Sequence, residues 1–271
     1  MSFIAALTTA LLLPGFTTVA NGPNGGRVLS GLFPGAARAG DVYLPPGFTP
    51  SSRYPVVYLL HGMPGSPSEF IQGTDLLDWA DASIASGAVR PFIAVMPAAG
   101  PDGKYNGEWA GPWERMLVHG VVPWVDTHLP TIATRRGRTL AGLSAGGFGA
   151  FDIGLRNPAL FGTIESWSGY FAPLRDGPFK NAPPSVLAAN DPQLLARSEA
   201  SRLARYRTRF FVATGPYHSH WFSPAQTIDF ADELRGLRLA VREQTVATRK
   251  GEWRDQMEAG LTFALSAQRS A

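Results

Sequence analysis

Short runs of apolar residues alternate along the chain with longer segments in which apolar positions recur every three or four residues. The runs at 54–61 (YPVVYLLH) and 91–96 (PFIAVM) are continuously apolar, which is typical of parallel strands covered on both faces. Further strands are expected at 27–32, 41–44, 138–141, 162–168, 209–214 and 237–246. Helical spacing is found at 75–86, 113–129, 147–155, 225–235 and 253–267. This alternation predicts an α/β fold, with a mostly parallel sheet and helices on both of its faces.

Some segments depart from this simple alternation. Residues 41–44 are followed by Pro45-Pro46-Gly47, which predicts an edge strand that ends in a turn. Residues 171–205 are rich in proline and irregular at first and helical later, so we expect a small lid-like insertion over one end of the sheet. Pro123 interrupts the helix expected at 113–129. No internal repeat or interdomain linker accompanies these segments, so one domain is the simplest organisation.

The first twenty residues have a pattern of their own. An apolar stretch at 3–13 precedes Pro14-Gly15, and Thr18-Val19-Ala20 offers a candidate small-residue cleavage site, as in a signal peptide. The usual basic lead is missing, because no Lys or Arg precedes Arg27, and the stretch is too short and interrupted for a membrane span. We expect a signal-like or disordered leader at 1–20 and a single domain at 21–271. A secreted or cell-envelope protein follows from a leader, whereas a segment packed on the domain implies a cytoplasmic one.

Composition narrows the function classes. The chain has 271 residues, of which 45% are hydrophobic and 17% charged, as in a folded protein with a substantial core. Lys and Arg outnumber Asp and Glu by three (24 − 21). A solvated turn explains the densest basic cluster, Arg135 to Arg138, as well as an anionic partner would, so nucleic-acid binding has no support. Cysteine is absent, which excludes disulfides, thiolate metal sites and a cysteine nucleophile.

Candidate chemistry centres on the stretch Ala141-Gly142-Leu143-Ser144-Ala145-Gly146-Gly147. Gly142, Ser144 and Gly146 match the pattern G-x-S-x-G, between an expected strand and an expected helix. In such a nucleophile elbow, the tight turn forces the serine into strained backbone geometry and exposes its hydroxyl, and glycines flank it because side chains there would collide with neighbouring elements. Ser144 is therefore the candidate nucleophile.

Several stretches of the chain match one family in their order and spacing. They are YLPPG at 43–47, YPVVYLLHGMPG at 54–65, VVPWVDTHLPT at 121–131, LAGLSAGGFGAFDIGLRNPALFG at 140–162 and SWSGYF at 166–171. With the elbow they resemble the α/β-hydrolase fold, and more narrowly the esterase family of esterase D, feruloyl esterases and the mycolyltransferase antigens. The likeness covers residues 40–171 well and the remainder only by element order. It implies a serine esterase or acyltransferase that acts on a small-molecule or lipid carboxylic ester, without a metal or an organic cofactor.

The resemblance also implies roles for other residues. The backbone amides of Met63 and Ala145 are the expected oxyanion donors. The family's acid follows the strand matched by 209–214, and its histidine follows the last strand. After that last strand, however, the chain reads ATRKGEW at 247–253, with Thr248 near the expected histidine and no histidine from there to the end.

The acid position departs as well. His218 stands near the place expected for an aspartate, while Asp229 and Asp232 fall further on, within the next expected helix. Two hypotheses follow. In the first, His218 or His220 acts as the base for Ser144. Glu252 then orients this base from the terminal loop, which inverts the usual assignment of the two loops. In the second, the protein is a catalytically silent relative that keeps the cleft for binding or a structural role.

Histidines and aromatic residues near the expected site complete the candidates. His61 is expected to hold its bend by hydrogen bonds, with substrate contact as an alternative. Tyr217, Trp221 and Trp109 lie on loops at the carboxyl ends of strands and are candidate pocket walls. Packing of the insertion on the domain is the preferred interpretation for most loop aromatics, and Tyr217 and Trp221 are the strongest pocket candidates. His218 and His220 point the same way on an extended segment, as metal ligands can, but no third ligand is evident. His119 and His128 are expected to be surface or packing residues.

Overall fold

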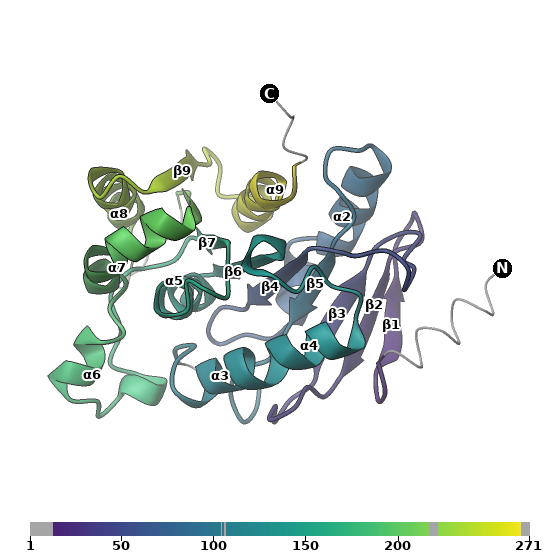
Figure 1. The fold of residues 1–271 in the computed structure, drawn as a ribbon, viewed down its shortest axis with the longest axis horizontal. Helices are drawn as coiled ribbons and strands as arrows, with labels where there is room; N and C mark the ends of the chain where they lie inside the picture. The colour runs from purple at the N-terminus through teal and green to yellow at the C-terminus, as the bar shows by residue number, and fades with distance from the viewer. Residues whose placement is uncertain (1–12, 104, 106, 217–221, 267–271) are drawn as a thin grey trace.

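The computed structural model describes residues 13–103, 105, 107–216 and 222–266. These residues form one nine-stranded sheet with the strand order β1-β2-β3-β5-β4-β6-β7-β8-β9 (Figure 1). The strands are β1 Thr17–Asn21, β2 Arg27–Gly31, β3 Gly40–Leu44, β4 Val56–Leu60, β5 Ile93–Met96, β6 Arg138–Leu143, β7 Thr163–Trp167, β8 Arg209–Thr214 and β9 Ala240–Thr245. Strands β4 to β9 pair in parallel, and β1 to β3 are antiparallel additions beside β5. The α/β architecture expected from the sequence is therefore confirmed.

Burial on both faces explains the continuously apolar strands. In β4, Val56, Tyr58 and Leu60 face one core cluster, whereas Val57 and Leu59 face the other. The strand at 40–44 also lies inside the sheet, between β2 and β5, so its expected position at an edge is wrong. The proline and glycine that suggested an edge follow the strand and only end it.

Helices cover both faces of the sheet (Figure 1). The α-helices are α2 Leu76–Ala85, α3 Pro112–Arg115, α4 Val122–His128, α5 Ala145–Arg156, α6 Pro184–Ala188, α7 Pro192–Tyr206, α8 Pro224–Gly236 and α9 Glu252–Leu265. Helices α2 and α9 pack on one face, and α4, α5, α7 and α8 pack on the other. The expected helices at 75–86, 225–235 and 253–267 are confirmed to within two residues at each end.

The segment expected as one helix at 113–129 is divided. A π-helical turn, Met116–Val121, joins α3 to α4, and Pro123 lies in the first turn of α4. Because proline lacks an N–H, the first turn of a helix is where it disrupts the hydrogen bonds least. The break thus falls where the sequence expects it.

The start of the described chain belongs to the domain. Leu13 and Phe16 are buried in the core, and β1 includes the Thr18-Val19-Ala20 stretch that suggested a cleavage site. The carboxylate of Asp81 in α2 ties down the β1–β2 hairpin, since it accepts hydrogen bonds from the backbone N–H groups of Asn24 (2.9 Å) and Gly26 (3.0 Å). The domain boundary expected at residue 20 thus falls inside β1, while residues 1–12 lie outside the described part.

The segment 171–205 is irregular and then helical, as expected from its sequence. It contains a short 3₁₀ turn, Gly177–Phe179, followed by α6 and α7. Helix α7 packs beside α5, with Ala196 and Leu203 buried in the core. This part of the expected lid-like insertion therefore belongs to the helical layer and does not lie over an end of the sheet. Among the described helices, none has the length and apolar character needed to cross a bilayer.

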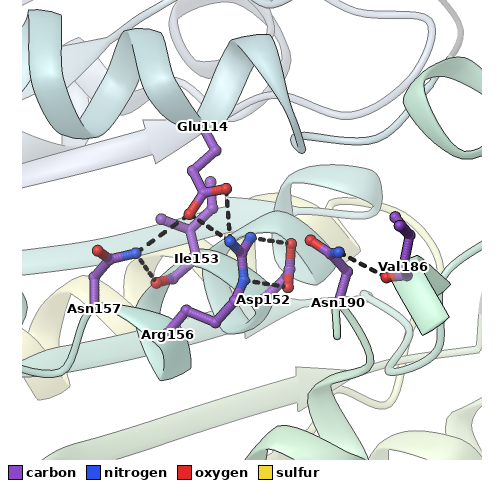
Figure 2. A network of polar contacts seen from close by, with 7 residues as sticks. All are labelled: Glu114, Asp152, Ile153, Arg156, Asn157, Val186 and Asn190. Carbon is purple, nitrogen blue, oxygen red and sulfur yellow. Dashed lines mark hydrogen bonds and ion pairs between the residues drawn. The ribbon is translucent and has the colours of Figure 1, made fainter. Parts of the chain in front are cut away.

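A partly buried ion-pair network joins α3 to α5 (Figure 2). Arg156 lies between Asp152, one turn earlier in α5, and Glu114 in α3. Its guanidinium donates to both carboxylates, at 2.7 Å and 2.6 Å. Burial raises the pKa of Asp152 to about 7, while Arg156 acts in the opposite direction. The network joins α3 to the end of α5, the helix that begins directly after Ser144.

Candidate active site

Ser144 occupies the turn between β6 and α5, where the sequence predicts an elbow. Its backbone angles, φ 55° and ψ −117°, lie in a region that residues other than glycine rarely adopt. The N–H of Ser144 donates to the carbonyl of Trp167 at the end of β7, 2.9 Å away, which fixes the turn against the neighbouring strand. Ser144 is half-buried, whereas the residues on either side of it are buried.

The flanking glycines are required by close backbone contacts. A Cβ built on Gly146 would collide with the carbonyl oxygen of Leu60, and one on Gly142 would collide with the backbone of Gly146. One on Gly147 would meet the hydroxyl of Ser166. These contacts explain why the elbow reads G-x-S-x-G-G, because any side chain at these positions would push α5 away from the sheet.

The bend at 61–65 lies beside the elbow. An added Cβ on Gly62 would be 3.5 Å from the Cβ of Ser144, so the two turns are in contact. The Gly62 N–H donates to the Glu69 carboxylate at 3.0 Å, and burial raises the pKa of that carboxyl above its usual range. The Ala145 N–H is the first of α5, where no intrahelical acceptor exists and the helix dipole is positive. The oxyanion role of Met63 and Ala145 stays a prediction.

His61 holds the bend at 61–65 through hydrogen bonds, as expected. It is buried, its Nε2 accepts the Ala99 N–H at 3.1 Å, and its Nδ1 therefore donates to the Gly62 carbonyl at 2.7 Å. Burial lowers the pKa of His61 to about 4, so the ring is neutral. With both nitrogens engaged, His61 cannot take a proton from Ser144.

Trp109 lies beside His61 in the core. Its indole donates to the His61 carbonyl at 2.9 Å, and its side chain is buried against Gly149 of α5. The substrate contacts predicted for His61 and Trp109 stay predictions, and the contacts that are present support the bend. The sequence did not predict that Trp109 would bind the His61 backbone, because this contact joins segments far apart in the chain.

Glu252, the candidate orienting acid, is held at the carboxyl end of the sheet. It begins α9 and is buried, and its Oε1 accepts hydrogen bonds from the Ser168 hydroxyl at 3.2 Å and from the Gln256 amide at 3.3 Å. A Cβ on Gly215 would collide with its carboxylate, so Glu252 lies directly against the end of β8. Ser168 directly follows Trp167, the residue that binds the Ser144 backbone. Ser144 follows β6, whereas Glu252 lies at the ends of β7 and β8, so both residues are at the carboxyl end of the parallel sheet.

Ser168 and Gln256 are functional candidates that the sequence did not reveal. Ser168 has φ 47°, a left-handed conformation that turns the chain just after β7. Gln256 lies one helical turn after Glu252, which is the spacing that places two side chains on one face. The i, i+4 spacing predicts only that Glu252 and Gln256 share one face of the helix. The burial of Glu252 is needed to show that this face belongs to the candidate site.

The remaining candidates for the base, the acid and the pocket walls are not brought together by the described part of the structure. Tyr217, His218, His220 and Trp221 lie outside the described residues. Asp229 and Asp232 are in α8, as expected, and Asp232 pairs with Arg235. Thr248 is exposed and its hydroxyl contacts the Lys250 carbonyl.

The two histidines before the elbow also fall where the sequence places them. His119 is exposed, and His128 stacks on Trp124 with their ring centres 4.4 Å apart. The surface or packing role expected for both is thus confirmed. Within the described part of the chain, no group of three or more His, Asp or Glu side chains could hold a metal ion.

An apolar cluster adjoins the elbow at Ala145. It consists of Ala110, Ala145, Phe148, Tyr170, Phe179 and Phe222, with Met63 and Leu174 packed against it. The Tyr170 ring stacks on Phe148 at 5.3 Å, and its hydroxyl donates to Glu108 at 2.7 Å. Burial raises the pKa of Glu108 to about 8. Ala145 thus belongs to this buried aromatic cluster, and Met63 packs against it.

Comparison with known proteins places this fold and elbow in one family. The sequence model of the Esterase family matches residues 34–263. Esterase Rv1288 of Mycobacterium tuberculosis is 34% identical over 142 residues, which covers 50% of this chain and 30% of that protein. An endo-1,4-beta-xylanase/feruloyl esterase of Xylanibacter ruminicola is 35% identical over 148 residues, covering 50% of this chain and 20% of the relative. The chain therefore matches less than a third of the length of these curated relatives.

Solved structures agree on the fold. A ferulic acid esterase superposes with a TM-score of 0.75 at 23% identity, covering 89% of this chain and 97% of the other. An S-formylglutathione hydrolase from Staphylococcus aureus superposes with a TM-score of 0.66 at 16% identity, covering 92% and 98%. The protein has the α/β-hydrolase fold. It belongs to the Esterase family.

Proposed function

We propose that the protein is a serine esterase or acyltransferase that acts on a carboxylic ester of a small molecule or lipid. The observation that carries this proposal is the strained, partly exposed Ser144 at the start of α5, with a buried carboxylate, Glu252, held at a neighbouring strand end. A strained serine costs stability, and such strain is retained where a nucleophile must stand clear of the sheet.

In the proposed reaction, the Ser144 hydroxyl attacks the ester carbonyl and the N–H groups of Met63 and Ala145 stabilise the oxyanion. His218 or His220 takes the serine proton and returns it to the leaving alcohol, and Glu252 orients the imidazole. Contact between Glu252 and Gly215 supports this arrangement, because the loop that carries both histidines begins at Gly215. Water then hydrolyses the acyl-enzyme, or a second alcohol accepts the acyl group.

An aromatic acyl group is the first substrate class to test. The cluster around Phe148 and Tyr170 borders the residues that would hold the oxyanion. Two of the similar proteins carry feruloyl or ferulic acid esterase in their names. Aromatic and apolar walls with few polar groups are the usual lining of a small-molecule site.

A catalytically silent binding protein is the second candidate. It is favoured by the exposed Thr248, which stands near the position where the family places its histidine and cannot accept a proton at neutral pH. This candidate keeps the fold and the elbow but predicts no acyl-enzyme.

A fluorophosphonate probe separates the two candidates. The esterase predicts covalent labelling of Ser144, located by mass spectrometry, and no labelling of a folded Ser144→Ala variant. An unlabelled Ser144 in the folded protein would support the silent alternative. If Ser144 is labelled, His218→Ala and His220→Ala are compared for hydrolysis of p-nitrophenyl acetate and methyl ferulate. Full activity in both variants would rule out either histidine as the base.

A further inference from the structure

A large groove lies at the amino ends of β6, β7, β8 and β9, on the edge of the sheet opposite Ser144. Its volume is about 770 Å³, within the range of small-molecule sites. Six arginines line it: Arg90, Arg135, Arg136, Arg207, Arg209 and Arg238. Among the described residues that line this groove, none is acidic. The arginine cluster at 135–138 contributes two of the six charges.

The fold by itself explains two of these arginines. Arg135 donates to the carbonyl of Tyr206, the last residue of α7, at 2.7 Å, and Arg209 donates to that of Phe263 in the last turn of α9, at 2.6 Å. Carbonyl groups at helix C-termini carry partial negative charge, so a cation there is favourable. Arg135 and Arg209 are therefore structural.

The other four have no such explanation. Arg90, Arg136, Arg207 and Arg238 are exposed, and within the described part of the chain their side chains form no hydrogen bond or ion pair. Arg207 and Arg238 have φ of 53° and 59°, a conformation in which glycine would be unstrained.

The positive charges of the arginines that line the groove also repel one another. Arg90 lowers the pKa of Arg209, and Arg136 lowers that of Arg135, in addition to the larger effect of burial on both structural arginines. Like charges gathered in this way destabilise the folded state unless an anion offsets them.

We propose that this groove binds a multivalent oxyanion of small-molecule size, one that carries two or more phosphate or carboxylate groups. Guanidinium groups bind both kinds of oxyanion through paired N–H donors. Arg136, Arg207 and Arg238 reach the groove from three different loops, so a ligand with several anionic groups can engage them together. The site is separate from Ser144 and does not depend on ester hydrolysis.

Calorimetric titration of the full chain with tripolyphosphate and with citrate tests this inference, with sodium chloride keeping the ionic strength constant. We expect saturable binding of at least one anion and a rise in Tm of several degrees. A variant with Arg136→Gln, Arg207→Gln and Arg238→Gln should bind at least tenfold more weakly. Arg205→Gln is the matched control, because Arg205 is exposed on α7 but does not line the groove.

Preference between the two anions tells whether phosphate or carboxylate is recognised. The inference is overturned if neither anion binds saturably, or if the triple variant binds as tightly as the control. Circular dichroism checks that the triple variant is folded. If it is not, Arg90→Gln with Arg136→Gln provides a second variant that leaves both left-handed positions unchanged.

Discussion

The Ser168 hydroxyl donates a hydrogen bond to Oε1 of Glu252 at 3.2 Å, across 84 positions of the sequence. This bond joins the end of β7 to the start of α9 and places a buried carboxylate against Gly215. The loop that carries His218 and His220 begins at Gly215, so Glu252 lies against the first residue of that loop. The usual positions of acid and base on the last two loops would then be exchanged.

If Glu252 orients the base, removing its charge should slow catalysis with little effect on folding. We expect Glu252→Gln to lower kcat for p-nitrophenyl acetate by about 10²–10⁴-fold, as for the acid of a serine triad. Ser168→Ala should lower it by about tenfold, because one hydrogen bond to the carboxylate is lost. Glu258→Gln, which changes a half-buried carboxylate paired with Arg254 on the same helix, is the control and should retain full activity. Equal rates in Glu252→Gln and Glu258→Gln would contradict the assignment.

Strain at the elbow predicts a difference between two inactive variants. At φ 55° and ψ −117°, alanine keeps the strain of serine, whereas glycine relieves it. We expect Ser144→Gly to be more stable than Ser144→Ala by about 1 kcal/mol in urea unfolding. Both should lose ester hydrolysis. Coinciding unfolding midpoints for the two variants would show that the turn is unstrained.

The sequence predicts the elbow and the sheet well because both depend on local patterns. Gly142, Ser144 and Gly146 are close in sequence, and buried strands such as β4 are apolar throughout. The positions of β3 and of Glu252 depend on pairings between distant segments, which periodicity does not contain. A short strand such as 40–44 has the same pattern inside a sheet as at its edge, and Ser168 is recognisable only after folding brings it to Glu252.

Buried carboxyl groups predict that the protein loses stability as pH rises. Burial raises the pKa of Glu165 to about 8, from 4.5 in the unfolded chain. Between these values the folded state holds a proton that the unfolded state has lost, so this contribution to stability is complete below about pH 4.5 and is lost by about pH 8. The free energy of unfolding should therefore fall across this range.

A Glu165→Gln variant should remove that dependence. The difference in unfolding free energy between Glu165→Gln and the wild type should rise by roughly 2–4 kcal/mol from pH 5 to pH 8, since one pKa unit corresponds to about 1.4 kcal/mol. Urea titrations at several pH values measure it. Glu199→Gln, which changes a half-buried carboxylate on α7, is the control. Parallel profiles for Glu165→Gln and the wild type would refute the assignment.

The ion-pair network of Figure 2 makes a further prediction about pH. Arg156 pairs with Asp152, whose side chain is fully buried, so Arg156→Gln leaves an uncompensated carboxylate. We expect a loss of about 3–5 kcal/mol at pH 8. The pKa of Asp152 is already about 7 and rises further without Arg156, so lowering the pH to 6 neutralises the carboxyl and should recover part of the loss. Arg202→Gln, in an exposed pair on α7, should cost less than about 1 kcal/mol at either pH. A loss for Arg156→Gln that is the same at pH 6 and pH 8 would mean that the unpaired Asp152 charge is not its cause.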